Sequence, residues 1–167
     1  MGRVTYGNLA SVWYTYDDAR RLTAIEHRDS LGQVIRRLAY QYDDRDLPVT
    51  LNEYDMTGCV AMTVFGYDDR GRLISESRSG DVAYQLSYEY DQGGNRTKKV
   101  DAINQIETVY HYDRENPLVY DSNNNRLEYH ETFDTSDPQN PVLLSTTWYY
   151  YNELGNVTRV DESARDG

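Results

Sequence analysis

Cysteine, basic residues and long apolar runs are all scarce in this sequence, and each scarcity excludes a class of protein. Cys59 is alone in 167 residues, so the chain has no disulfide framework. No apolar run is long enough for a membrane span, and no basic start leads into an apolar stretch as in a signal peptide. Lys and Arg number 17 against 28 Asp and Glu, a net charge of −11. Pairs such as Arg36-Arg37 and Lys98-Lys99 are too short to make a basic stripe, so nucleic acid is not expected as a partner.

Residues that could perform chemistry are also sparse. His27, His111 and His130 have no metal-ligand spacing to one another or to Cys59, so no metal site is predicted. Adjacent aspartates such as Asp17-Asp18 resemble paired carboxylates, but neighbours in a turn point apart, and turn chemistry explains them better. Calcium at such a turn is the remaining alternative, although the ligand ladder of calcium loops is missing. We therefore expect no enzyme, no catalytic residues and no cofactor.

Tyrosine is the abundant side chain, with 17 copies against 2 tryptophans and 2 phenylalanines. Many of these tyrosines belong to a repeated phrase, Tyr-x-Tyr-Asp or a near form of it. Its six copies end in Tyr16-Asp17, Tyr42-Asp43, Tyr67-Asp68, Tyr90-Asp91, Tyr112-Asp113 and Tyr151-Asn152. Successive copies lie 26, 25, 23, 22 and 39 residues apart, and residues 120–127 resemble a degenerate seventh copy. Residues 1–167 are therefore predicted to be one array of six or seven repeats.

Strand periodicity fills the segments between copies. From Val82 to Tyr90 every second residue is large and apolar, and those between are small or polar, as on a strand with one apolar face. A second turn signal near the middle of each repeat, as at residues 29–33, divides it into two strands. Residues 133–142 hold two prolines among polar residues and should form an inserted surface loop. The predicted fold is all-β, an array of antiparallel hairpins with about a dozen strands.

The aspartate of each copy has a structural explanation. A type I turn favours Asp or Asn first and Gly fourth, because the side-chain oxygen accepts backbone N–H groups and the fourth residue often needs a positive φ. Gly71, Gly94 and Gly155 stand at the fourth position, whereas Arg20 and Asp46 take it in the first two copies and should weaken those turns. We expect the aspartate or asparagine to anchor a turn. In each copy the second tyrosine, which precedes this aspartate or asparagine, should be buried more deeply than the residue just before it.

Units such as YDDRGRL at 67–73, YDQGGNR at 90–96 and YNELGNV at 151–157, recurring at this spacing, resemble the YD repeats of the Rhs family. The resemblance implies β-hairpin arrays that spiral into a curved sheet or shell, as in bacterial Rhs and polymorphic toxins, the C components of insecticidal toxin complexes, and teneurins. It also implies a secreted or cell-surface location. The family's self-cleavage signature, resembling Asp-Pro-x-x-Gly-Arg-Phe, does not occur here, so an internal stretch of shell wall is expected.

Three aromatic rings are expected on the face opposite the repeat tyrosines. Trp13, Trp148 and Tyr150 could stack on sugars, although packing against another layer or the inserted loop is the simpler interpretation. Asn95 and Asn156 match the N-glycosylation pattern, but both lie at turns, where asparagine is common for conformational reasons.

Two functions remain open. The leading hypothesis is a non-catalytic wall segment that encloses a toxin or other cargo in an exported bacterial protein, with further repeats of the parent shell and the enclosed toxin domain as partners. The alternative is an extracellular interaction module that binds glycans or a partner surface in adhesion. Because the first and last hairpins lack polar capping units, their edges should pair with further strands of the parent or with other copies of the chain, or should fray.

Overall fold

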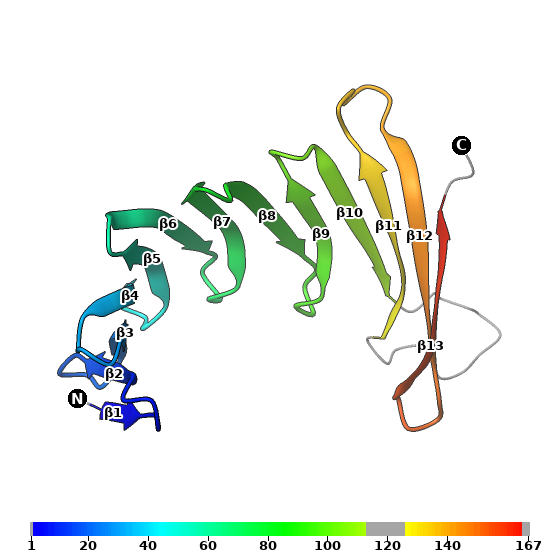
Figure 1. Ribbon diagram of the computed structural model, residues 1–167. Helices are drawn as coiled ribbons and strands as arrows, with labels where there is room; N and C mark the ends of the chain where they lie inside the picture. Colours follow the sequence, from blue (N-terminus) through cyan, green and yellow to red (C-terminus); the bar gives the residue numbers. More distant parts are fainter. Residues whose placement is uncertain (1, 113–125, 165–167) are drawn as a thin grey trace. The chain divides into compact units, whose positions relative to one another are not determined.

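Thirteen β-strands and no helix make up the part of the chain that the computed structural model describes, residues 2–112 and 126–164 (Figure 1). No helix long and apolar enough to cross a membrane therefore occurs among these residues. Each strand pairs antiparallel with the strand that follows it in the chain wherever pairing is described within a unit. The predicted all-β fold of antiparallel hairpins is confirmed.

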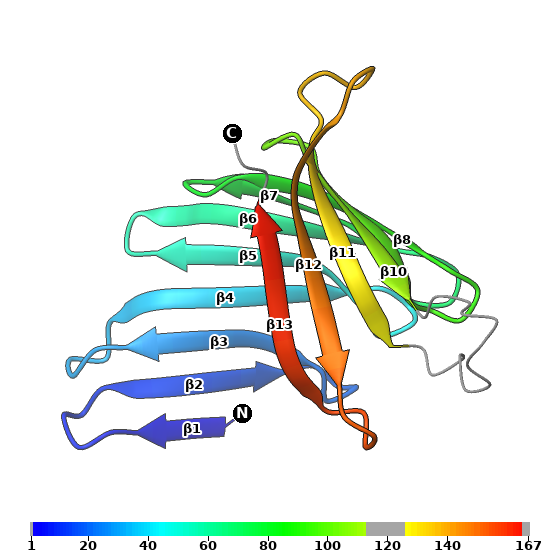
Figure 2. The ribbon, with the colours of Figure 1, turned by 90° about the vertical axis from the view of Figure 1, so that its right-hand side faces the viewer.

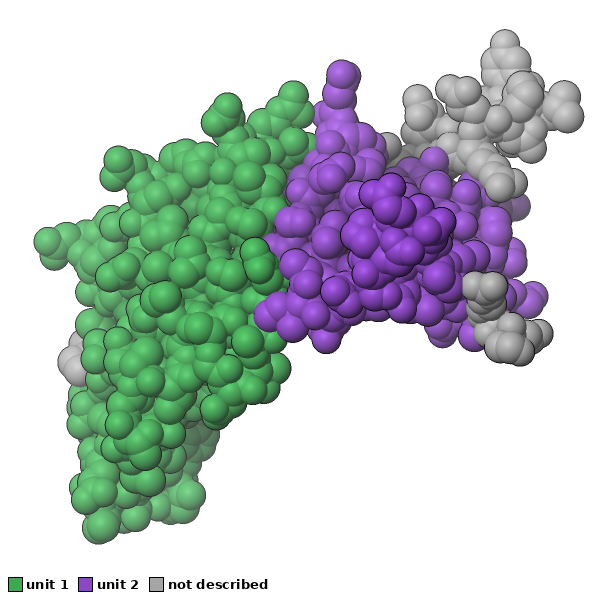
Figure 3. All heavy atoms as spheres, turned by 90° about the horizontal axis from the view of Figure 1, so that it is seen from above, with its two compact units in different colours: residues 1–85 green, residues 86–167 purple. Residues whose placement is uncertain are grey.

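The chain divides into two compact units, residues 1–85 and 86–167 (Figure 3). Unit 1 contains β1 (Gly2–Thr5), β2 (Ser11–Tyr16), β3 (Leu22–Arg28), β4 (Val34–Tyr42), β5 (Pro48–Asp55), β6 (Gly58–Tyr67) and β7 (Leu73–Gly80). Strand β8 (Tyr84–Tyr90) spans the boundary. Unit 2 continues with β9 (Arg96–Asp101), β10 (Ile106–Tyr112), β11 (Leu127–Asp134), β12 (Val142–Tyr151) and β13 (Val157–Ala164).

Within each unit the strands lie in chain order, so every turn joins neighbours. Unit 1 runs from β1 to β7, as the stacked blue-to-green strands of Figure 2 show, and unit 2 runs from β8 to β13. The turns after β2, β4, β6, β8 and β12 are the Tyr-Asp turns, which we call the YD turns. The turns after the odd-numbered strands lie at the opposite ends of the strands. One repeat is thus two strands and one YD turn.

Alternation along the strands separates two faces. In β8 the residues from Tyr84 to Tyr90 alternate between half-buried and exposed, and the large side chains are the half-buried ones. In each unit we call the side that carries the repeat tyrosines the tyrosine face, with Tyr14 and Tyr40 in unit 1 and Tyr88 in unit 2, and the other side the opposite face. Register preserves this distinction from strand to strand, since one residue of slip would exchange the faces.

Very little of this structure is fully buried. Among the described residues only Val12, Ala24 and Ala61 are buried apolar side chains, at 4–5% exposure. The strands of each unit form a single layer, so both faces keep contact with solvent. Cross-strand side-chain pairs and hydrogen bonds must therefore supply stability that a second layer supplies in a sandwich.

Two details differ from the sequence-based expectations. Thr15 and Tyr16 are both exposed, Tyr16 at 47%, so the expected burial of the second tyrosine is not seen in the first copy. In four later copies the tyrosine hydroxyl is instead bonded to a carbonyl at the start of the preceding strand. Strand pairing in the β11–β12 hairpin continues to Asp134 and Val142. The loop is therefore residues 135–141, which contain both prolines.

Candidate functional site

The YD turns share one backbone conformation. The first residue donates its N–H to the carbonyl of the fifth, at 2.9–3.0 Å, and the fourth donates to the carbonyl of the first. The fourth residue has a positive φ in every described case: Arg20 (65°), Asp46 (64°), Gly71 (78°), Gly94 (94°) and Gly155 (81°). The two non-glycine residues therefore adopt the same left-handed conformation, and the turns expected to be weakened still form.

The side chain of the first residue closes each YD turn. One carboxylate oxygen of Asp43 accepts the backbone N–H groups of Arg45 and Leu47, both at 2.9 Å. Asn152 does the same with its amide oxygen. The N–H at the fifth position is the main reason why the pKa values of Asp17, Asp43 and Asp68 are lowered, because these bonds stabilise the ionised form.

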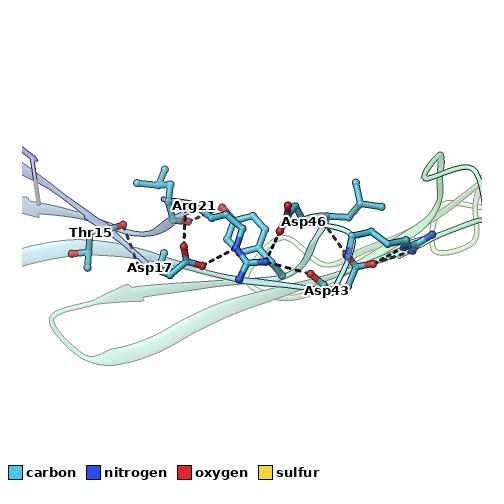
Figure 4. Close-up of polar contacts among 10 residues, drawn as sticks. Thr15, Asp17, Arg21, Asp43 and Asp46 are labelled. Atoms are coloured by element: carbon cyan, nitrogen blue, oxygen red, sulfur yellow. Dashed lines mark hydrogen bonds and ion pairs between the residues drawn. The ribbon is translucent and has the colours of Figure 1, made fainter. Parts of the chain in front are cut away.

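Arginine side chains connect one YD turn to the next. Arg21 donates to the second carboxylate oxygen of Asp17 at 2.7 Å and reaches Asp46 in the following turn, also at 2.7 Å (Figure 4). The same guanidinium donates to the Asp43 carbonyl at 3.4 Å and lies 5.0 Å from the Tyr42 ring centroid. A single side chain therefore contacts two successive repeats through charge, hydrogen bonds and a ring.

The next YD turn is connected to its successor in the same way, but through an arginine at the third turn position instead of the fifth. Arg45 pairs with Asp43 at 3.0 Å and donates to the carbonyl of Asp68 at 2.7 Å. Arg72 pairs with Asp68 at 2.7 Å, in the geometry of Arg21 with Asp17. Cation and acid are thus paired along this side of unit 1.

The second tyrosine of a copy makes a further contact between repeats. Its hydroxyl donates to the carbonyl of the residue that begins the preceding strand. The described bonds are Tyr42 to Leu22 (2.6 Å), Tyr67 to Pro48 (2.8 Å), Tyr112 to Arg96 (3.1 Å) and Tyr151 to Leu127 (2.7 Å). Burial raises the pKa of Tyr42, Tyr67 and Tyr112, so the hydroxyls stay protonated and act as donors.

A β-bulge accompanies every YD turn. In the first copy Thr15 pairs with Ala24 and Tyr16 with Leu22, so Thr23 is an extra residue. The equivalent extra residues are Val49, Ile74, Thr97, Glu128 and Thr158. The hydroxyls of Thr23 and Thr158 donate to cross-strand carbonyls at 3.2 and 3.1 Å. Bulges bend the strand and increase its twist, so each repeat carries the same local bend.

A buried carboxylate sits on the tyrosine face of unit 1. The side chain of Glu53 is 10% exposed and accepts hydrogen bonds from Arg36, at 2.8 Å, and from Arg78. The Arg78 bond is the main cause that lowers the pKa of Glu53. Arg36, which interrupts the apolar pattern of β4, is therefore explained by its acidic partner on β5.

Trp13 lies in a row of residues that face one another across five strands. Register places Arg3, Trp13, Glu26, Arg37 and Tyr54 opposite one another in that order. We call these five residues together with Arg28 the arginine row. The guanidinium groups of Arg3 and Arg28 lie 4.8 and 5.2 Å from the Trp13 ring centroid. Both contacts use ring surface that a sugar would need.

Trp148 belongs to a second row, in unit 2. Register aligns His111, Tyr129, Trp148 and Asp161, which we call the ring row. The first three rings stack, with centroids 4.2 and 4.4 Å apart. Tyr150 lies on the same face, 44% exposed, with Arg159 5.3 Å from its ring centroid. The three rings proposed for sugar stacking are therefore divided between two units.

The histidines and the cysteine do not gather. His111 lies on the opposite face and bonds Glu131 at 3.1 Å, whereas His130 lies between Tyr110 and Tyr149 on the tyrosine face. Burial lowers the pKa of His130. Cys59 is an exposed free thiol. Across residues 2–112 and 126–164, no group of three His, Cys, Asp or Glu side chains could hold a metal ion.

The two glycosylation-pattern asparagines occupy the fifth position of YD turns. Asn95 donates its side-chain amide to Asp91 at 2.9 Å and also its backbone N–H, also at 2.9 Å. Asn156 donates its backbone N–H to Asn152. The threonines two residues later are the bulge residues Thr97 and Thr158. The pattern is thus part of turn and bulge geometry.

Sequence reasoning missed the bulges and the bonds between repeats. A signal was present, because a β-branched residue stands six positions after the turn aspartate or asparagine in five copies: Thr23, Val49, Ile74, Thr97 and Thr158. Asp113 and residues 120–125 of the possible seventh copy lie outside the described residues.

Residues 67–103 match the family model described as RHS Repeat. Two solved structures share the fold, a crystal structure of TcdB2-TccC3-Cdc42 and a Photorhabdus luminescens Tc holotoxin pore with a TccC3 mutation. Each has a TM-score of 0.55 at 18% identity and covers 93% of this chain, which spans 10% of the matched chain. None of the curated proteins compared with this chain matches it. The resemblance to Rhs repeats is therefore confirmed.

Proposed function

We propose that this chain, which contains an Rhs repeat, is a non-catalytic wall segment of an Rhs-type shell that encloses a toxin or other cargo in an exported bacterial protein. The premise is the match of residues 67–103 to the RHS Repeat model, together with the fold shared with TccC3-containing structures. Enclosure and export go beyond that premise and belong to the proposal.

One observation carries the proposal: side chains of one repeat bind the backbone of its neighbour. Tyr42 donates to the Leu22 carbonyl of the repeat before it, and Arg45 donates to the Asp68 carbonyl of the repeat after it. These contacts use main-chain acceptors, so they fix the spacing between repeats. A chain of units joined only to their neighbours is the way a continuous wall is built.

Cysteine labelling in the parent polypeptide tests enclosure, because a closed wall has one face that solvent-borne reagents cannot reach. In a Cys59→Ser background, Ser87→Cys places a thiol on the opposite face and Thr108→Cys places one on the tyrosine face. We expect a bulky maleimide to label one of the two in the native parent and both after unfolding. In the isolated chain both should react. Equal labelling of both thiols in the native parent would contradict enclosure.

The adhesion alternative depends on rings that can receive a glycan. In the ring row the rings stack on one another, and Arg159 lies over Tyr150, an arrangement that favours packing within the sheet. A glycan array probed with the chain and with its Tyr150→Ala and Trp148→Ala variants tests this alternative. Binding that both substitutions abolish, with the circular dichroism spectrum unchanged, would support adhesion in place of enclosure.

A further inference from the structure

The opposite face of unit 1 is positively charged. Within the described strands β1–β7 it carries four charged side chains, Arg3, Glu26, Arg28 and Arg37, and its remaining residues are neutral. Three guanidinium groups therefore face one carboxylate, although the whole chain has a net charge of −11. All four charges lie in the arginine row.

Glu26 does not satisfy these arginines. It accepts a bond from Arg28 at 2.6 Å and lies 3.7 Å from Arg37, so one carboxylate serves two cations. Arg3 stacks on Trp13 and has no acid within ion-pair distance among the described residues. The buried Nε of Arg28 has no acceptor within that same part of the chain. A stacked guanidinium keeps its in-plane N–H groups available for carboxylate oxygens.

Three exposed apolar side chains lie on the same face as the arginine row, farther along the strands β4 and β6. Ile35, Met62 and Val64 are 44, 41 and 40% exposed. A sugar–phosphate backbone or a charged glycan would leave these side chains against polar groups. An extended polypeptide directs alternate side chains to opposite sides of its backbone, so a segment that lies with a backbone edge on the face can turn acidic side chains to the arginines and the apolar ones between them to Met62.

We propose that the arginine row is a binding site for an acidic polypeptide segment of a partner chain, with apolar residues between its carboxylates. Arg3, Arg28 and Arg37 pair with the carboxylates, and Met62 and Val64 contact the apolar side chains. The site does not depend on cargo enclosure, because it is defined by residues of unit 1 alone.

Fluorescence anisotropy with the full chain tests the site. The probe is a labelled synthetic peptide of alternating Glu and Val, compared with peptides in which Lys or Gln replaces Glu. We expect the Glu peptide alone to bind, with an affinity that falls as NaCl is raised. Arg3→Gln and Arg37→Gln should each weaken binding at least about fivefold, as expected for a charge-assisted hydrogen bond. Arg159→Gln removes an exposed arginine that also lies over a ring, in unit 2, and should leave binding unchanged.

Glu26→Gln gives the opposite sign, because it removes the competing carboxylate, and should tighten binding severalfold. Misfolding cannot produce that gain, so the prediction holds even where an arginine variant fails to fold. Equal binding of the Glu and Gln peptides, or no change in Arg37→Gln, would overturn the site. Tighter binding of heparin or an oligonucleotide than of the Glu peptide would overturn a polypeptide as the occupant.

Discussion

The arginine row of unit 1 and the ring row of unit 2 occupy the same kind of position, on the opposite face of consecutive paired strands, but are held together differently. Trp13 contacts two guanidinium groups, whereas Trp148 stacks on Tyr129, which stacks on His111. The YD turns and tyrosine hydroxyl bonds recur in both units. The backbone repeat is thus maintained by the turn side of the strands, and the faces are free to differ in charge and chemistry.

The largest difference between the units should come from the buried carboxylate of unit 1. Glu53→Gln leaves Arg36 and Arg78 without their shared acid and should lower the free energy of unfolding of unit 1 by about 3 kcal/mol. Urea unfolding followed by tryptophan fluorescence reports unit 1 in a Trp148→Phe background and unit 2 in a Trp13→Phe background. The matched control in unit 2 is Glu107→Gln, whose ion pair with Lys98 is more exposed and should cost under about 1 kcal/mol. Equal losses would show that Glu53 is not a special feature of unit 1.

The tyrosine hydroxyl bonds should make the units alike. Tyr67→Phe in unit 1 and Tyr151→Phe in unit 2 each remove one bond to a carbonyl and should each cost about 1 kcal/mol. Tyr16→Phe is the control, because Tyr16 has the same place in the repeat and is 47% exposed. It should be nearly neutral in the same urea experiment. If Tyr16→Phe costs as much as the other two substitutions, the hydrogen bond between repeats does not explain the loss of stability.

Substitutions at the fourth turn position should change stability in opposite directions in the two units. Arg20→Gly relieves a left-handed non-glycine residue and should stabilise unit 1 by about 0.5 kcal/mol, after the entropy that glycine adds to the unfolded chain. Gly155→Ala introduces that strain in unit 2 and should destabilise it by about 1 kcal/mol. Thermal unfolding of both variants checks the signs, and a destabilised Arg20→Gly variant would contradict the prediction.

The smallest expected effect is a difference in how the stability of the two units depends on pH. Burial between Tyr110 and Tyr149 lowers the pKa of His130 below its usual 6.5, although Glu162 partly opposes this. The unfolded state then binds the proton more readily, so the stability of unit 2 should fall as the pH drops below about 6.5. The lowered groups of unit 1 are carboxylates such as Asp43 and Glu53, whose contribution is lost only at more acidic pH.

Urea unfolding of a Trp13→Phe variant at a series of pH values, with tryptophan fluorescence reporting unit 2, measures this pH-dependent step in stability. A His130→Gln variant should remove it. A step that persists in that variant would assign the pH dependence to another group.

Local patterns predicted most of the fold. Alternation in residues 82–90 locates a strand, and the Asp-x-x-Gly spacing locates the turn that follows it. Both patterns follow from local backbone preferences. Contacts between repeats could not be predicted this way, because the partner of Tyr42 is a backbone carbonyl at Leu22, which carries no side-chain signal. The pairing of Arg36 with Glu53 likewise depends on register across strands, which the sequence does not display.

The shared conformation of the YD turns has a consequence for how such a chain tolerates change in length. From the turn aspartate to the start of the next strand the count is constant, with Asp17 to Leu22, Asp43 to Pro48 and Asp68 to Leu73 each five residues apart. The differences among the 26-, 25- and 23-residue intervals therefore arise in the strands and in the turns at the other ends. Insertions placed there, for example between Thr57 and Gly58 of the β5–β6 turn, would leave every contact of the YD turns intact. The turns opposite the YD turns are therefore the places where each hairpin should tolerate insertions, whether natural or engineered.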